Sequence, residues 1–451
     1  MILRANSRLR GQIGTEGVEL FEYGVGAVER ILPHVEVLPW KEASMWAKPG
    51  AVWASRRRTQ LRMTVSVGDR ARGRSVTAFV QRRGVFTGQN ADRRILDLRE
   101  QDICRRIALR VSAVLTLEQG CVKAASSQAI RASFDELVVA EHIQQHHGLS
   151  LSLPELFSTL HKLAEQTYEN RALTFGCILD HAAPSAAPVV FPRDFLDTKK
   201  YRALSDGFRT AYYLSGLGQL IDFVDLDGFD GRELSGKHFY PAWAEPMARA
   251  SRDRKCGVAL SRQGDLLVFD EGTLRFTYRN GHWQYWNHSH LVRLLRDRAR
   301  AQNVAPSFLG YLIGEIYRSA LDISFRRSGG LFVILRNKAN LHMIVRSGDA
   351  INERGRSRAD AAFDWAVGGK AVARSVIVEL ASLDGAVVLN NSAAILAYGA
   401  VLRPRKLGHV RGSEGSRTKA AIGASFYGLA VKVSSDGDIT VYHRGKEFIR
   451  M

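Results

Sequence analysis

The last third of the chain alternates between helical and strand periodicity, and this alternation constrains the fold more than any other feature. Apolar residues recur every three or four positions from Pro306 to Arg327, and Gly329-Gly330 marks the end of that helix. The segments that follow are a buried strand at 331–335, helices at 359–367 and 371–381, and strands at 386–390 and 394–402. Helices that alternate with strands predict the α/β class, here a mixed β-sheet flanked by helices.

The residues before this stretch predict α+β N-terminal regions. We expect a helix at 16–31, a two-stranded hairpin from the alternating segments 61–67 and 76–86, and helical structure from 93 to 146. At 451 residues the chain is long enough for two or three domains. The predicted division is a basic α+β region at 1–150, a middle α/β region at 151–254, and a C-terminal region at 255–451 with its core at 305–445.

The residues from Gly257 to Trp286 predict a meander of short strands. Asn280-Gly281 is a strong hairpin-turn signal because both residues tolerate a positive φ. Aromatic side chains in this segment could stack on nucleic-acid bases, but at strand spacing we favour packing within a sheet. They are Phe269, Phe276, Tyr278, Trp283, Tyr285 and Trp286.

The chain is strongly basic, with a formal net charge of +19 from 50 Arg and 14 Lys against 45 acidic residues. A basic face suits a polyanion such as nucleic acid, although the excess of Arg over Lys is also what a GC-rich genome produces. The densest stretch is 55–110, where fifteen Arg stand against five acidic residues. Its arginines include Arg56, Arg57, Arg58, Arg70, Arg72, Arg74, Arg82 and Arg83.

Targeting and redox signals predict a cytoplasmic protein. No run of eighteen apolar residues is present, and residues 1–14 lack the apolar segment of a signal peptide, so we expect no membrane contact. The four cysteines form no CxxC pair, which argues against a disulfide framework or a zinc knuckle. His142 and His146 are four apart and could share a metal, but no third ligand is evident, and a helix end closed by Gly148 is favoured.

A basic loop, 411–416 (RGSEGS), runs into the expected start of a helix. Ser416 is the predicted N-cap, and the backbone N–H groups of a helix start, together with Arg417 and Lys419, suit a phosphate. A basic surface turn explains the same pattern equally well. Asp384, at the start of a strand, could bind a metal or accept a hydrogen bond from a ribose, and Gly385 would let a ligand approach the backbone.

Five segments in order resemble the diadenylate cyclase domain, best known from the DNA-integrity-scanning protein. They are GGLFVILRN, LDGAVVLNN, AAILAYGAVLRP, GSRTKAAIG and LAVKVSSDGDITVY, within about residues 305–445. The resemblance implies a domain that binds ATP through an Asp-Gly-Ala motif and a phosphate motif. In active members, two facing domains each bring one ATP and use Mg²⁺ or Mn²⁺ to make cyclic di-AMP.

The resemblance assigns roles residue by residue. Asp384, Gly385 and Ala386 match the Asp-Gly-Ala motif, in which the Asp holds metal and orients the attacking 3′ hydroxyl. Leu402 matches a leucine beside the adenine, and Arg403 stands where the family has proline.

The phosphate motif is matched by Gly415, Ser416 and Arg417, whereas Thr418 replaces a His and Lys419 an Arg. In the last motif, Ser434-Ser435-Asp436-Gly437, the simplest alignment places Ser435 where the family has a metal-binding Glu, and a shift by one position would let Asp436 substitute for it. Lys keeps the charge of Arg without its bidentate fork, and a hydroxyl does not replace a carboxylate as a metal ligand. These departures fall on the residues that would carry the chemistry.

Three functional hypotheses follow. The first is a catalytically degenerate sensor of an adenine nucleotide or a cyclic dinucleotide. The second is an active diadenylate cyclase that works as a homodimer or higher oligomer, with Mg²⁺ or Mn²⁺ at Asp384. The third is a nucleic-acid-binding module that uses the Arg-rich hairpin.

Overall fold

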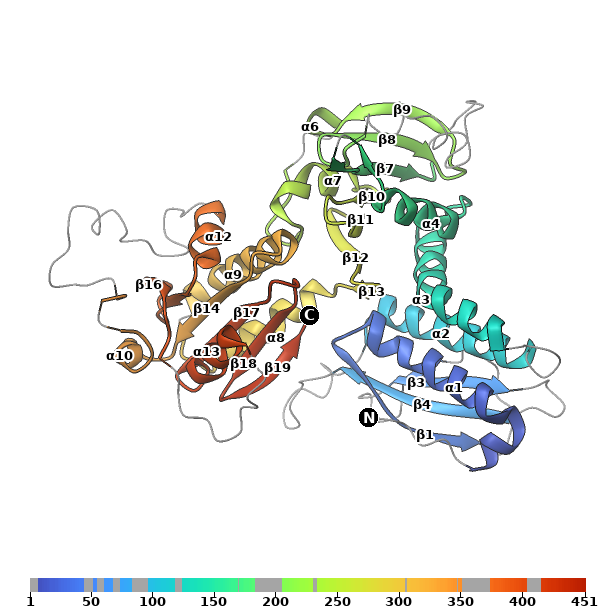
Figure 1. Ribbon diagram of the computed structural model, residues 1–451, viewed down its shortest axis with the longest axis horizontal. Coiled ribbons are helices and arrows are strands. Elements are labelled where there is room, and N and C mark those ends of the chain that lie inside the picture. The colour runs from blue at the N-terminus through green and yellow to red at the C-terminus, as the bar shows by residue number, and fades with distance from the viewer. Residues whose placement is uncertain are drawn as a thin grey trace. The chain divides into compact units, whose positions relative to one another are not determined.

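The structure is a computed structural model that describes residues 7–43, 52–54, 61–67, 74–82, 96–117, 124–168, 170–182, 205–229, 233–304, 306–346, 348–350, 374–403 and 415–451. The chain divides into two compact units, drawn together in Figure 1. Unit 1 comprises Met1–Leu234 and Trp243–Trp286, and unit 2 comprises Ser235–Ala242 and Asn287–Met451.

Unit 1 begins with a four-stranded antiparallel sheet and two helices packed on it (Figure 1). The strands, in the order β1-β4-β3-β2, are β1 (Val35–Ala43), β2 (Val52–Ala54), β3 (Leu61–Val67) and β4 (Arg74–Arg82). The pairing of β3 with β4 confirms the predicted hairpin. Helices α1 (Ser7–Ile31) and α2 (Leu98–Leu117) approach closely at Gly24, because a Cβ there would collide with the side chain of Val111.

The second part of unit 1 is a seven-stranded sheet in the order β13-β12-β11-β10-β7-β8-β9. Its strands are β7 (Phe175–Asp180), β8 (Thr210–Ser215), β9 (Leu220–Asp225), β10 (Cys256–Leu260), β11 (Leu266–Asp270), β12 (Thr273–Arg279) and β13 (His282–Tyr285). Smaller elements are β5 (Thr167–Tyr168), β6 (Arg171–Ala172), α6 (Leu226–Phe229), η2 (Ala242–Ala244) and α7 (Glu245–Ala250). The β12–β13 turn has a positive φ at both Asn280 and Gly281, as the sequence predicts.

This sheet departs from the predicted domain division at residues 254 and 255. The meander strands β10–β13, which the sequence analysis grouped with the C-terminal region, continue the sheet of the middle region, because β10 pairs with β7 along its whole length. Both strands are buried along most of their length, so their apolar pattern gives no information about which sheet they join.

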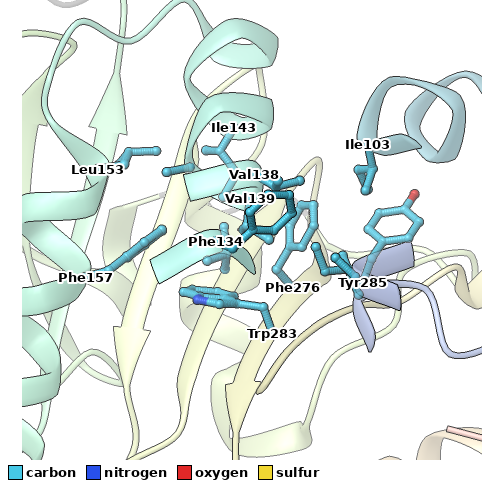
Figure 2. Close-up of a cluster of buried hydrophobic side chains, with 14 of the residues drawn as sticks. Ile103, Phe134, Val138, Val139, Ile143, Leu153, Phe157, Phe276, Trp283 and Tyr285 are labelled. Atoms are coloured by element: carbon cyan, nitrogen blue, oxygen red, sulfur yellow. The ribbon is translucent and has the colours of Figure 1, made fainter. Parts of the chain in front are cut away.

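The meander aromatics pack rather than face solvent. Helices α3 (Ala124–His147) and α4 (Leu153–Ala164) contribute Phe134, Val138 and Phe157 to a cluster with Phe276, Trp283 and Tyr285 (Figure 2). The rings of Phe157 and Trp283 lie 4.7 Å apart between centroids. The prediction of sheet packing over base stacking is therefore confirmed for these side chains, which are buried.

Unit 2 is a six-stranded mixed sheet with helices on both faces (Figure 1). The order is β16-β15-β14-β17-β18-β19, from β14 (Gly330–Leu335), β15 (Ala386–Leu389), β16 (Ile395–Ala400), β17 (Gly428–Val433), β18 (Ile439–His443) and β19 (Lys446–Arg450). The helices are α8 (His288–Arg300), α9 (Pro306–Arg326), η3 (Lys338–Asn340), α10 (Leu341–Ile344), α12 (Arg374–Ser382) and α13 (Ser416–Ala424). The predicted α/β class is thus confirmed.

An ion pair between the half-buried Arg374 and the buried Asp322 joins the short segment 235–242 to the helices of unit 2. Arg374 on α12 donates from Nε and Nη2 to the two carboxylate oxygens of Asp322 on α9, at 2.5 and 2.7 Å. The Asp322 carboxylate also accepts from the backbone N–H of Ala242, and Arg374 donates to the carbonyl of Tyr240. Among the described residues, no helix is both long and apolar enough to span a membrane.

Candidate functional site

The sequence motifs of unit 2 meet at one end of its sheet, which we call the motif end. β14 and β15 run parallel and both begin there. β17 runs antiparallel to β14 and ends there, with Val433 opposite Gly330. β16 also ends there, with Ala400 opposite Ala386. Asp384 and Gly385 immediately precede β15, Leu402 follows β16, and Ser434 follows β17. With Gly330 at the start of β14, four segments of the chain meet at this end.

Asp384 lies in the short connection between α12 and β15, and its side chain is exposed. The connection is held at the end of α12, where the hydroxyl groups of Ser382 and Ser328 lie 3.2 Å apart. Leu383, beside Asp384, is 47% exposed although it is a large apolar residue. A carboxylate and an apolar side chain therefore face solvent together at the motif end.

Gly385 has a φ of +148°, a conformation that favours glycine. A Cβ added there would lie 2.5 Å from the carbonyl oxygen of Gly399 and 2.6 Å from the nitrogen of Ala400. The chain that approaches Gly385 closely is therefore the neighbouring strand β16, whereas the sequence analysis attributed the glycine to a ligand. Ala386, the next residue, is fully buried in the core of the sheet.

The phosphate motif forms the first turn of α13. Gly415, with extended φ and ψ angles, is the N-cap and Ser416 is the first helical residue, so the prediction of Ser416 as N-cap is wrong by one position. Among the described residues, no side chain caps the start of this helix. The backbone N–H groups of Ser416, Arg417 and Thr418 have no acceptor within the helix, because the first turn of an α-helix has none. Three backbone N–H donors therefore lie in the same turn as the cationic residues Arg417 and Lys419.

Lys432 is a third cation at this helix start, and the sequence analysis missed it. Its Nζ donates to the Thr418 hydroxyl at 2.9 Å, which ties β17 to the first turn of α13. Burial, followed by the neighbouring Arg450 guanidinium, lowers the pKa of Lys432 from its ordinary value. A lysine inside the otherwise apolar strand GLAVKV was the available signal, because lysine is depleted in half-buried strands.

Arg417 lies next to the start of β14. A Cβ on Gly329, whose φ is +71°, would lie 3.3 Å from the central carbon of the Arg417 guanidinium. Glycine at this position therefore leaves room for the guanidinium at the motif end. The first turn of α13 and the Asp384 connection consequently lie at the same end of the sheet, on either side of β14.

Leu402 is 8% exposed and packs in the core with Ile344 and Val345. A buried leucine offers little surface to an adenine. The exposed apolar residues at this end are instead Leu383 and Val401, and Val401 is 53% exposed. Sequence reasoning did not single out either residue.

Among the described residues, the motif end shows no group of three ligand side chains close enough together to hold a divalent metal. Asp384 precedes β15, and the turn after β17 offers the exposed hydroxyl of Ser435 together with the exposed carboxylates of Asp436 and Asp438. Within the described ranges, the one set of three His, Cys, Asp or Glu side chains close enough to share an ion is His146, His147 and Asp270, in unit 1. No catalytic step through Mg²⁺ or Mn²⁺ follows from the motif end.

The Arg-rich hairpin is only partly described. Arg82 is 6% exposed and donates to the buried carboxylate of Glu100 at 2.5 Å, so its guanidinium is part of the core of unit 1. Arg74 begins β4. The other arginines that the sequence analysis singled out lie outside the described residues; they are Arg56, Arg57, Arg58, Arg70, Arg72 and Arg83.

Comparison with protein-family models finds no match, and no curated protein matches the chain. Among solved structures, the chain is similar to a double mutant of DacA from Staphylococcus aureus, at 22% identity over 30% of this chain and 83% of that one, with a TM-score of 0.21. It is also similar to a hypothetical membrane spanning protein from Bacillus cereus, at 21% identity over 36% of this chain and 76% of that one, with a TM-score of 0.23. With scores this low, neither alignment supports an inference about function.

Proposed function

We propose that unit 2 binds an adenine nucleotide or a cyclic dinucleotide at the motif end and acts as a sensor. The observation that supports the proposal is the convergence of Arg417, Lys419 and Lys432 on the uncapped first turn of α13, at the same end of the sheet as Asp384. Backbone N–H donors and cations at a helix start suit a phosphate group.

The other parts of a nucleotide have matching partners. The exposed carboxylate of Asp384 accepts hydrogen bonds from ribose hydroxyls, and the exposed Leu383 and Val401 provide an apolar surface for a base. These residues supply binding and orientation. Because Thr418 and Ser435 stand where the resembling family has a His and a metal-binding Glu, we propose binding without turnover, and we place the active cyclase second.

Calorimetric titration of the full chain with ATP and with cyclic di-AMP tests the proposal. Lys432→Gln should weaken binding about 10- to 100-fold, because a charge-assisted hydrogen bond contributes about 1.5–3 kcal/mol. Lys446→Gln is the matched control. Lys446 is exposed and begins β19 opposite His443, at the other end of the sheet, so its variant should bind as the wild type does.

Two results would count against the sensor. If neither nucleotide binds to folded protein, or if both variants lose affinity equally, the motif end does not hold the phosphates. If mass spectrometry detects cyclic di-AMP after incubation with ATP and Mn²⁺, and Asp384→Asn abolishes it, the protein is a cyclase despite its altered motifs.

The nucleic-acid hypothesis stays a proposal that rests on the Arg-rich hairpin. Counterion release makes such binding fall steeply with salt. Because Arg82 is buried against Glu100, Arg82→Gln would not change the salt slope if the remaining arginines make the contacts. A flat salt dependence of oligonucleotide binding would exclude this role.

A further inference from the structure

Two histidines and a buried aspartate come together in unit 1, away from the motif end. α3 ends with His146 and His147, and Asp270 is the last residue of β11. One ligand atom from each of the three lies within 4.8 Å of the others. The sequence analysis considered His142 and His146, but His142 instead bonds through Nδ1 to Asp102 at 2.7 Å. The histidine that joins His146 is instead the adjacent His147, and the third ligand, Asp270, comes from β11, which is distant in the sequence.

The His147 ring lies between a backbone carbonyl and the Asp270 carboxylate. Its Nδ1 lies 3.0 Å from the carbonyl oxygen of Arg254, to which it can only donate. The other ring nitrogen, Nε2, lies 3.4 Å from Oδ1 of Asp270. No hydrogen bond joins these two atoms.

Asp270 supplies the second, independent observation. The residue is 3% exposed, and its Oδ1 has no hydrogen-bond partner in the described part of the chain. A buried carboxylate oxygen without a donor is costly and needs an explanation. The other oxygen, Oδ2, is bonded by the guanidinium of Arg99 on α2.

His146 completes the set. Its Nε2 lies 3.0 Å from Nη2 of Arg99, a group that can only donate, so this nitrogen presents a lone pair. It lies 3.7 Å from Oδ2 of Asp270. In a tetrahedral zinc site with ligand bonds of about 2.0–2.2 Å, neighbouring ligand atoms are about 3.4 Å apart. The separation of 3.4 Å from His147 Nε2 to Oδ1 equals that value, His146 Nε2 lies 3.7 Å from the other oxygen, Oδ2, and one ligand atom from each of the three residues lies within 4.8 Å of the others.

We propose that His146, His147 and Asp270 bind a divalent transition-metal ion of the Zn²⁺ type. Two imidazole nitrogens and one carboxylate oxygen are the ligands that this class of ion prefers, with a fourth position for water. The Arg254 carbonyl fixes the His147 ring, as groups behind metal ligands commonly do.

Arg99 also limits the affinity of the site. Its guanidinium contacts both Oδ2 of Asp270 and Nε2 of His146, and Nε of Arg275 lies 3.8 Å from the same Oδ2. A metal ion must displace Arg99 from His146 and experiences repulsion from both guanidinium groups. Removing the Arg99 charge should therefore strengthen metal binding.

The test uses the untagged full chain with Co²⁺, read by visible absorption, and with Zn²⁺, read by calorimetry. We expect one ion per chain and a tetrahedral Co²⁺ spectrum. His147→Gln and Asp270→Asn should abolish both signals, and Arg99→Gln should tighten Zn²⁺ binding about tenfold or more, a gain that misfolding cannot produce. His282→Gln, which changes an exposed histidine at the start of β13, should bind as the wild type does.

Three results would overturn the proposal. One is the absence of a stoichiometric ion in both the wild type and Arg99→Gln. Another is unchanged binding in His147→Gln, which would place the ion elsewhere on the surface. The third is weaker binding in Arg99→Gln with the fold intact, because the guanidinium would then support the ion rather than compete with it.

Discussion

Substituting Gly385 by alanine separates two explanations for glycine at the motif end. If the glycine serves the neighbouring strand, Gly385→Ala destabilises the pairing of β15 with β16 before any ligand is added. The new Cβ would lie 2.6 Å from the Ala400 nitrogen and the φ of +148° disfavours it. Overpacking costs about 1–3 kcal/mol and a disfavoured φ costs about 1–3 kcal/mol, so we expect about 4 kcal/mol.

Gly399→Ala is the matched control on the facing strand. Gly399 has a φ of +56°, but the nearest atom to a Cβ there is 3.7 Å away, an ordinary contact. Only the left-handed backbone conformation disfavours alanine at this position, and it should lower the stability by about 1 kcal/mol. The two substitutions add the same methyl group to adjacent chains, and they should differ about 100-fold in their effect on local opening.

Hydrogen exchange read by mass spectrometry suits this comparison, because it reports on β15 and β16 separately from the rest of the chain. Peptides that cover these two strands should exchange about 1000-fold faster in Gly385→Ala and about 5-fold faster in Gly399→Ala, while β10 and β11 stay unchanged. Equal acceleration in the two variants, or none in Gly385→Ala, would refute the reasoning from strand packing.

Three further predictions follow from buried polar groups and thiols. Asp322→Asn should destabilise unit 2 by about 3–5 kcal/mol, measured as faster hydrogen exchange in α9 and α12, because it leaves the charge of Arg374 without its carboxylate. Burial acts to raise the pKa of Asp102, but hydrogen bonds from His142 and Arg106 outweigh it and the pKa is lowered. The ionised carboxylate therefore stabilises the fold above about pH 4, the pKa of Asp in an unfolded chain, and this stabilisation is lost as the pH falls below that value. Between about pH 7 and about pH 3, the urea midpoint of unfolding should fall less in Asp102→Asn than in the wild type. Three cysteines are buried, which raises their pKa, and they should react with Ellman's reagent only after unfolding; they are Cys104, Cys177 and Cys256.

Local features of the fold could be predicted from the sequence because short-range chemistry decides them. The helix from Pro306 to Arg326, the strand that follows it and the Asn280-Gly281 turn are set by periodicity and by residues that tolerate positive φ. The partner of β10 could not be predicted, because a strand buried on both faces has no polar side to orient it.

The candidate sites show the same division. Arg417 and Lys419 were identifiable because a basic loop precedes a helix, a pattern contained in a few consecutive residues. Lys432 reaches Thr418 only through the pairing of β17. Asp270 reaches His147 only because β11 and the end of α3 belong to the same unit. Contacts between distant segments depend on the topology, which a single sequence does not reveal.

The short segment 235–242 has a consequence for how this architecture could have been assembled. The chain leaves unit 1 at residue 234, contributes eight residues to unit 2, returns at 243 and leaves again at 286. The Asp322–Arg374 pair uses the backbone of Ala242 and Tyr240, so residues 287–451 alone lack two of its hydrogen-bonding partners. A recombination event that transferred residues 287–451 alone would therefore leave unit 2 incomplete. To transfer all of unit 2 in one segment, the event must include residues 243–286, which belong to the sheet of unit 1.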